Sequence, residues 1–378
     1  MLTRHHPLRG ASLGSQRQIT SFHFGPGNAA PGDAPLRKVY IQASLHADEL
    51  PGMLVAHHLR QRLSALEAQG RLRAEVVLVP VANPIGLGQT VLRRNEGRFE
   101  LASGQNFNRH YPSLAPLVTP LIEGRLGADE AGNTALIRGA MREAIAAQPA
   151  VDELSHQHLT LLGLAIDAEV VLDLHCDSEA LPHLYTGTPL WPQAEPLARL
   201  LGTDVQLLAL ESGDNPFDEA CSQAWWQLAG QFSGRHPIAM ACLSVTVELR
   251  GEYDVSHELA AQDADALVNF LIHRGLVDGP APTLPPLRQP ATPLAGTEVL
   301  KAPASGVVVY RRALGEWLQP GDVVADVVDP LSGEQHPVAT TIHGLLFTRE
   351  AQRYTTAGRP LIKVAGAAVV RDGKLSSD

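Results

Sequence analysis

Cysteines, lysines and long apolar runs are all scarce in this sequence. The 378 residues include three cysteines, Cys176, Cys221 and Cys242, which are far apart and form no CxxC pair. Three cysteines are too few for disulfide bonds to stabilise a chain of this length, and this cysteine content fits a reducing compartment best. No stretch approaches the roughly 18 uninterrupted apolar residues of a membrane span, and the opening segment MLTRHHPLRGASLGSQRQ lacks the apolar core of a signal peptide. We therefore expect a cytoplasmic protein.

Positive charge is in short supply as well. Lys and Arg number 30 against 40 Asp and Glu, which gives a formal net charge of −10, and no block of basic residues occurs. Such a chain offers no electrostatic footprint for a phosphate backbone or an anionic membrane, so we expect neither nucleic acid nor a membrane as a partner. Hydrophobic residues at 44% and charged residues at 19% are ordinary globular values, so the chain can bury a sizeable core.

Proline marks a break near residue 278. The segment 278–296, DGPAPTLPPLRQPATPLAG, repeats proline and small residues that cannot continue a helix or a central strand. We interpret this segment as a linker. It divides the chain into a larger unit of residues 1–277 and a smaller one of residues 297–368.

Upstream of the linker, short apolar runs alternate with helical patterns. The runs are Val39–Ala43, Val76–Val81, Val170–Leu174 and Leu243–Leu249. Helices are expected from about Pro51 and over residues 132–148, 219–232 and 258–275. This alternation predicts an α/β fold with a largely buried sheet. The segment Gly86–Glu130 has little periodicity and is too long for a simple connection, so we expect it to carry function.

Downstream of the linker, short strands with period-two alternation are separated by glycine turns. Residues 302–328 can be laid over residues 339–365, with Gly306 matching Gly344 and Gly321 matching Gly358. Two similar halves imply a small all-β barrel, and the pattern resembles biotinyl/lipoyl-type domains. In those domains the attachment lysine lies at a hairpin tip between the halves, whereas residues 328–337 contain no lysine. A carrier with a swinging arm is therefore disfavoured, and a lid, spacer or assembly module is favoured.

Residue types that bind metals follow two of the predicted strands, at the sheet edge where open α/β folds bind ligands. His46 and Glu49 lie three apart in the turn after the first strand, so their side chains can converge on one cation. His175 offers a third ligand. Side-chain alternation places Asp173 and Asp177 on the face of His175, so a carboxylate is expected to orient or accompany the imidazole. Three such ligands leave a fourth position for water, as in catalytic zinc sites.

A general base for this chemistry is offered by Glu248. Ser244, Thr246 and Glu248 share one face of a predicted strand that is otherwise Val and Leu, and a carboxylate there is either functional or costly.

Each of these signals has a plainer reading. An HxxE spacing is common by chance, and a histidine at a strand end is more often structural than a ligand. The coincidence of two histidines and two glutamates at predicted sheet edges is what favours a site. Six other histidines are expected to be surface or capping residues, namely His5, His6, His57, His58, His156 and His158.

Together these residues resemble the succinylglutamate desuccinylase/aspartoacylase family, which shares its fold with the zinc carboxypeptidases. The resemblance runs from about residue 15 to residue 275. It is carried by the HxxE at 46–49, Asn83-Pro84, Asn108-Arg109 in NFNRHYP, the strand-end His175, and Glu248 in TVELR. It implies a mixed sheet flanked by helices, and family members with a β-rich C-terminal domain match the downstream unit.

The resemblance also implies roles for individual residues. His46, Glu49 and His175 would bind one zinc ion per chain, and Glu248 would activate water.

The same resemblance implies a carboxylate clamp of Asn108 and Arg109, for which a guanidinium fork is well suited. Arg98, in GRFE, is the best candidate for polarising the scissile carbonyl. Arg93 and Arg94 compete for that role.

Two departures from the family pattern stand near the predicted zinc site. Ala47 follows the first histidine, where the family often has glycine. Asn106 stands two residues before the Asn-Arg pair, where the family commonly has aspartate. If that aspartate orients the first histidine, Asn106 can still accept a hydrogen bond but brings no charge, and metal affinity is expected to be lower.

We therefore predict a zinc-dependent hydrolase that cleaves the amide bond of a small, carboxylate-bearing N-acyl amino acid or related amide through a metal-activated water. A zinc carboxypeptidase acting on short peptides is the alternative within this class. A catalytically silent carboxylate-binding protein is the alternative from another class, although such a binder would not need Glu248. The expected partner is a small-molecule substrate that carries a carboxylate. The sequence is also compatible with a homo-oligomer.

Overall fold

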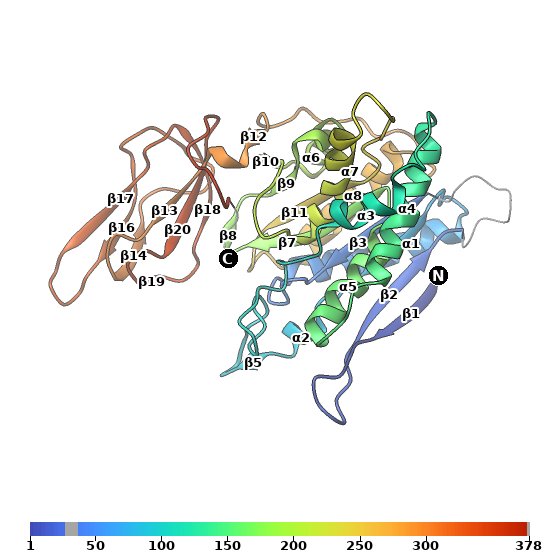
Figure 1. Cartoon of the computed structure of the whole chain (residues 1–378). Helices are drawn as coiled ribbons and strands as arrows, with labels where there is room; N and C mark the ends of the chain where they lie inside the picture. Colours follow the sequence, from blue (N-terminus) through green and yellow to red (C-terminus); the bar gives the residue numbers. More distant parts are fainter. Residues whose placement is uncertain (27–36, 376–378) are drawn as a thin grey trace.

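A mixed sheet of nine strands crosses the larger part of the molecule (Figure 1). The computed structural model describes residues 1–26 and 37–375, and all elements are counted within them. In sheet order the strands are β1 (Leu2–Pro7), β2 (Gln18–Phe24), β4 (Glu75–Val79), β3 (Lys38–Ala43), β7 (Val170–Asp177), β11 (Leu243–Gly251), β9 (His183–Gly187), β10 (Val205–Ala209) and β12 (Thr292–Pro293). The pairs β1–β2, β2–β4 and β9–β11 are antiparallel, and the other neighbours are parallel.

Helices cover both faces of this sheet. One face packs against α1 (Pro51–Ala68), α6 (Trp191–Leu201) and α8 (His257–His273). The opposite face packs against α3 (Leu114–Ile122), α4 (Glu130–Ala146), α5 (Glu153–Ala165) and α7 (Phe217–Gln231). Shorter elements are α2 (Pro84–Leu87), the 3-10 turn η1 (Thr188–Leu190), and the hairpin of β5 (Thr90–Val91) and β6 (Arg94–Asn95). The predicted α/β fold is confirmed. Every helix of the described residues is too short or too polar to cross a membrane.

The strongest apolar patterns form the elements predicted from them. Helix α1 begins at Pro51, and α4, α7 and α8 each begin one or two residues before their predicted starts. The central strands β7 and β11 continue two or three residues beyond their apolar runs. These extensions carry polar side chains toward the carboxyl edge of the sheet, where parallel strands of α/β folds present their functional groups.

After β12 and the turn η2 (Leu294–Gly296), the described chain forms two smaller sheets. One contains β13 (Thr297–Lys301), β20 (Pro360–Ala365), β18 (Gly344–Arg349) and β15 (Trp317–Leu318). The other contains β17 (Gln335–Ala339), β16 (Val323–Val328), β14 (Gly306–Tyr310) and β19 (Tyr354–Thr355). Apolar side chains from both sheets share one core. The pairing gives two separate sheets, so the predicted small all-β barrel is not confirmed.

The two halves of this C-terminal part correspond strand for strand. Strands β14, β15 and β16 of the first half match β18, β19 and β20 of the second, and Gly306 and Gly344 each open a strand. The short middle strand of each half pairs with the first strand of the other half. Strand β15 pairs with β18, and β19 pairs with β14. Gly321 and Gly358 both have positive φ, 94° and 84°, before the third strand of each half. The repeat seen in the sequence is therefore a structural repeat.

The C-terminal strands are joined to the main sheet just beyond β7 (Figure 1). The short strand β8 (Glu179–Ala180) pairs antiparallel with β18. On either side of β8, Leu181 N donates to Phe347 O at 2.9 Å and Ala351 N donates to Ser178 Oγ at 2.8 Å. The chain that leaves β7 is thus hydrogen-bonded into the C-terminal part.

Candidate metal centre

The first two candidate ligands lie in the turn after β3. The chain leaves β3 through Ser44, whose φ of 64° places a non-glycine residue in the left-handed region. Glu49 N then donates to His46 O at 3.1 Å, which closes the turn. Gly97 packs on this turn so closely that a Cβ would lie 2.2 Å from Asp48 N, so only glycine fits there. The HxxE spacing is therefore held by a tight turn at the edge of the sheet.

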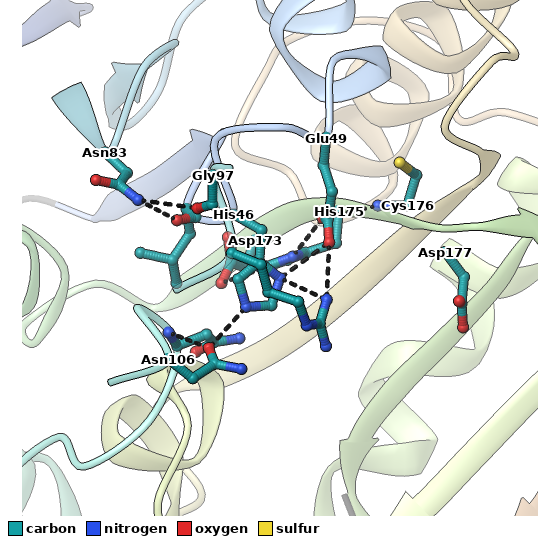
Figure 2. Close-up of polar contacts among 12 residues, drawn as sticks. His46, Glu49, Asn83, Gly97, Asn106, Asp173, His175, Cys176 and Asp177 are labelled. Atoms are coloured by element: carbon teal, nitrogen blue, oxygen red, sulfur yellow. Dashed lines mark hydrogen bonds and ion pairs between the residues drawn. The ribbon is translucent and has the colours of Figure 1, made fainter. Parts of the chain in front are cut away.

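Glu49 lies between the two candidate histidine ligands (Figure 2). His46 Nδ1 is 2.9 Å from Glu49 Oε1, and His175 Nδ1 is 2.8 Å from Glu49 Oε2. All three residues are buried, and their ligand atoms lie within 4.8 Å of one another. Within the described chain this is the one group of three or more His, Cys, Asp or Glu residues with such geometry. The structure brings together the three predicted ligands, and the cluster could hold a metal ion.

The imidazole nitrogens that face away from Glu49 also have partners. His46 Nε2 is hydrogen-bonded to Asn106 Oδ1 at 2.9 Å (Figure 2), and His175 Nε2 forms an ion pair with Asp173 Oδ2 at 3.0 Å that lacks hydrogen-bond geometry. Such partners fix the ring orientation and leave the inner nitrogen for a metal. Two imidazole nitrogens and a carboxylate are the donor set of many catalytic zinc sites. The residues present therefore fit a zinc ion.

Burial and mutual contact shift the pKa values of the cluster. Burial, helped by the charge of Arg98, lowers the pKa of His46 to about 4. Burial alone would raise the pKa of Glu49, but His46 and His175 hold that pKa well below its usual range. Burial opposes protonation of His175, yet Asp173 and Glu49 raise its pKa well above the ordinary value. The buried carboxylates of Glu49 and Asp173 favour a cation at this place.

Arg98 reaches the metal cluster, whereas its two competitors do not. Its Nη1 lies 3.2 Å from His46 Nδ1 and 3.3 Å from Glu49 Oε1. Arg93 and Arg94 are exposed at the β5–β6 hairpin, and neither lines the cavity that holds the cluster. Of the three arginines, Arg98 is the one that the structure places at the predicted site.

The predicted carboxylate clamp lies in the same cavity. Asn108 and Arg109 are both buried, and Arg109 Nη1 donates to the Asn108 carbonyl at 2.7 Å. Asn108 Oδ1 accepts a hydrogen bond of 2.8 Å from Phe217 N at the start of α7. Burial and the nearby charge of Arg98 lower the pKa of Arg109, against the opposing effect of carboxylates that include Asp218. Asn108 therefore has a structural contact in addition to its predicted role.

Glu248 lies on β11 directly beside His175, because the two residues are register partners on neighbouring parallel strands. Its side chain lines the cavity, and its buried Oε2 has no hydrogen-bond partner among the described residues. Burial and the charge of Glu49 raise the pKa of Glu248 to about 8. Two residues later, Arg250 has a φ of 68°, so the backbone is strained on this side of the cavity as well.

A cavity of about 1150 Å³ joins these residues. From the α/β part it is lined by His46, Glu49, Arg98, Arg109, His175 and Glu248. The C-terminal strands also line it, with Lys301, Arg349 and Lys363 among their charged residues. Lys363 Nζ donates to Asp177 Oδ2 at 2.5 Å, two residues after His175. The C-terminal part thus supplies charged side chains to the candidate site.

Two residues of the site's surroundings were not predicted, although the sequence contains a signal for each. Lys363 is one of only four lysines and lies in the apolar run PLIKVA. Gln42 interrupts the apolar run VYIQA and donates to Asp173 at 3.0 Å. A polar residue inside a buried strand needs a partner, which is Asp177 for Lys363 and Asp173 for Gln42.

The prediction that His158 lies at the surface or a cap is wrong. His158 is buried in α5, where its Nε2 is 2.9 Å from Phe107 O and its ring stacks on Tyr111 at 4.2 Å between centroids. Burial lowers its pKa to about 4. The error arises because α5 was not among the predicted helices, so its inner face was not recognised.

Fold and site together define an α/β protein with a candidate metal centre of two histidines and one glutamate in a large cavity. Comparison with known families agrees with this class. Residues 35–123 match the model of the succinylglutamate desuccinylase/aspartoacylase catalytic domain, a segment that contains His46, Glu49, Arg98, Asn108 and Arg109. The resemblance to this family of deacylases is thereby confirmed. A search of curated proteins finds no match to the chain.

Several solved structures share the fold over almost the whole chain. A succinylglutamate desuccinylase/aspartoacylase family protein from Shewanella amazonensis is 24% identical, with a TM-score of 0.83 over 97% of this chain and 98% of that one. A protein of the same description from Shewanella frigidimarina is 22% identical, with a TM-score of 0.82 over 97% of both chains. The ectoine utilization protein EutE (DoeB) from Ruegeria pomeroyi is 16% identical, with a TM-score of 0.66 over 97% and 95%. At these identities the likeness establishes the fold.

Proposed function

We propose that this protein is a zinc-dependent hydrolase that cleaves the amide bond of a small, carboxylate-bearing N-acyl amino acid or related amide. The observation that carries the proposal is the buried cluster of His46, Glu49 and His175 with Glu248 beside it on the neighbouring strand. A binding protein would need neither this ligand set nor a carboxylate whose Oε2 is unsatisfied in the cavity wall.

The residues of the cavity divide the reaction among them. Zinc held by the cluster would supply Lewis acidity to the water and the carbonyl group. Glu248 accepts a proton from the attacking water and delivers it to the leaving amine. Arg98 donates to the oxygen on which negative charge develops. Asn108 and Arg109 bind the carboxylate of the substrate and hold its amide near Glu248.

Metal content tests the first half of the proposal. Protein purified without a metal-affinity tag is expected to contain about one zinc per chain, and His175→Ala almost none. His336→Ala is a matched control, because His336 lies on β17, away from the cavity. Wild type that neither contains zinc nor takes it up on titration would exclude the metallohydrolase.

Turnover tests the second half. Glu248→Gln removes the base but keeps the shape, so kcat for N-acyl amino acids is expected to fall by about 10²–10⁴ while zinc content stays the same. Undiminished turnover would refute the assigned base. A panel of N-acyl amino acids and short peptides separates a deacylase from a carboxypeptidase, since only the peptidase requires the C-terminal residue of a peptide. Zinc binding without turnover of either set would favour the silent binding protein.

A further inference from the structure

A chain of buried polar side chains runs beneath the candidate metal centre, from β3 to β7. Tyr40 Oη donates to Gln42 Oε1 at 2.8 Å, and Gln42 Nε2 donates to Asp173 Oδ1 at 3.0 Å. The other oxygen, Asp173 Oδ2, is the one that lies 3.0 Å from His175 Nε2. Tyr40, Gln42 and Asp173 are each 0% exposed, so water cannot replace a lost partner.

The strand register fixes this arrangement. Strands β3 and β7 run parallel, and Gln42 and Asp173 are Cα partners in that pairing. Asp173 and His175 point to the same face of β7 because side chains alternate along a strand. Gln42 on β3 is therefore linked to His175 on β7 through Asp173.

The chemistry of each group fixes the direction of the hydrogen bonds. An ionised carboxylate only accepts hydrogen bonds, so Gln42 must turn its amide nitrogen toward Asp173. The amide oxygen of Gln42 then faces Tyr40, whose hydroxyl satisfies it. A flipped amide would place two oxygens against each other in a dry environment, which is costly.

We propose that Gln42 and Tyr40 are positioning residues of the metal centre. By holding one oxygen of Asp173, they keep the other against His175 Nε2, so that His175 Nδ1 stays aimed at the place beside Glu49 where a metal would lie. This inference rests on the proposed metal-dependent function and extends it to two residues that contact neither metal nor substrate.

Zinc affinity, measured by competition with a chromogenic chelator, tests the proposal without recourse to activity. Gln42→Met keeps the volume and removes both hydrogen bonds, and zinc affinity is expected to fall about 10–100-fold. Tyr40→Phe leaves the amide in place and should cause a smaller loss. The matched control is Gln206→Met on β10, because Gln206 is equally buried but donates to Thr203, far along the sheet from the cluster. It should keep wild-type affinity even where its loss of thermal stability equals that of Gln42→Met.

A double-mutant cycle separates positioning from a general structural effect. Asp173→Asn removes the charge through which Gln42 acts, so Gln42→Met should have little further effect on zinc affinity in that background. Full additivity of the two losses would overturn the proposal, as would wild-type affinity in folded Gln42→Met. If wild-type protein binds no zinc at all, the proposed function falls and this inference falls with it. Unchanged affinity in Gln42→Met beside a zinc-binding wild type overturns this inference alone.

Discussion

The two candidate histidine ligands differ in the charge of the group behind them. His175 is backed by the Asp173 carboxylate, whereas His46 is backed by the neutral amide of Asn106. Asn106 Oδ1 accepts from Asn108 N as well as contacting His46, and its Nδ2 has no hydrogen-bond partner among the described residues. An aspartate at position 106 would therefore keep both contacts of that oxygen and lose no hydrogen bond.

We expect Asn106→Asp to bind zinc about tenfold more tightly than wild type, because a carboxylate raises the basicity of the imidazole that it contacts. Chelator competition measures the affinity, and the thermal unfolding temperature of the metal-free protein serves as the control for folding. Equal or weaker zinc binding in a folded variant would show that the amide already orients His46 fully.

The buried ring of His158 links stability to pH. Its pKa is lowered to about 4 in the folded protein, first by burial, against an ordinary value of 6.5. The folded pKa lies below the unfolded one, so the neutral ring contributes its full stability above pH 6.5, and this contribution is lost as the pH falls through 4. Between pH 7 and pH 5 the loss from this residue is about 2 kcal/mol.

Urea unfolding of wild type and His158→Gln at both pH values measures this loss. Glutamine can still donate to Phe107 O but does not titrate, so the variant should lose about 2 kcal/mol less than wild type on going from pH 7 to pH 5. The stacking on Tyr111 is lost at both pH values and cancels in the comparison. Parallel pH profiles for the two proteins would contradict the assignment.

At the scale of elements, the start of α7 depends on a residue from a distant loop. The residue before the helix is Pro216, which has no side-chain acceptor, and Asn108 Oδ1 instead accepts from Phe217 N. His110 N and Tyr111 N donate to the carbonyls of residues 214 and 215. The loop that carries the predicted clamp is therefore hydrogen-bonded to the first residue of α7 and to the segment just before it.

Asn108 thus has two roles that different substitutions should separate. Asn108→Ala removes the acceptor and is expected to cost about 1 kcal/mol of unfolding free energy. Asn108→Asp keeps the acceptor and the stability but places a negative charge beside a bound carboxylate, so KM for an anionic substrate should rise with little change in stability. Urea unfolding and steady-state kinetics measure the two effects. A fall in KM for Asn108→Asp would mean that the part of the cavity lined by Asn108 and Arg109 does not bind a carboxylate.

Elements with a strong local pattern could be predicted from the sequence. The apolar runs of β3, β7 and β11 and the proline at the start of α1 are local signals, and each element formed where it was expected. The same holds for the metal cluster, because His46 and Glu49 share one turn and His175 ends a strand.

Contacts set by long-range register could not be predicted in the same way. The pairing of Gln42 with Asp173 depends on which strands are neighbours, and the contact of Lys363 with Asp177 depends on how the C-terminal strands dock. The edge strand β1 carries mostly exposed residues, so it has no apolar pattern to recognise. The only local signals for the contacts of Gln42 and Lys363 were these polar residues themselves, each inside an apolar run.

At the scale of the whole molecule, three ion pairs join the C-terminal part to the end of β7 and to β8. Arg349 and Arg353 both contact Glu179, at 2.5 and 2.6 Å, and Lys363 contacts Asp177 at 2.5 Å. Together with the pairing of β8 and β18, these contacts hold the C-terminal part against the cavity. These contacts are better explained if the C-terminal part is a fixed wall of the candidate site than if it is a mobile arm.

The Lys363–Asp177 pair tests this view of the molecule. Both side chains are about three-quarters buried, so Lys363→Met leaves a carboxylate uncompensated near the cavity and is expected to cost about 3 kcal/mol of unfolding free energy. Asp177→Asn combined with Lys363→Met removes both charges and should recover most of that loss. Lys301→Met is the matched control, because Lys301 lines the same cavity from β13 but is exposed. If Lys363→Met and Lys301→Met unfold at the same urea concentration as wild type, the ion pair does not hold the two parts together, and the β8–β18 pairing alone must do so.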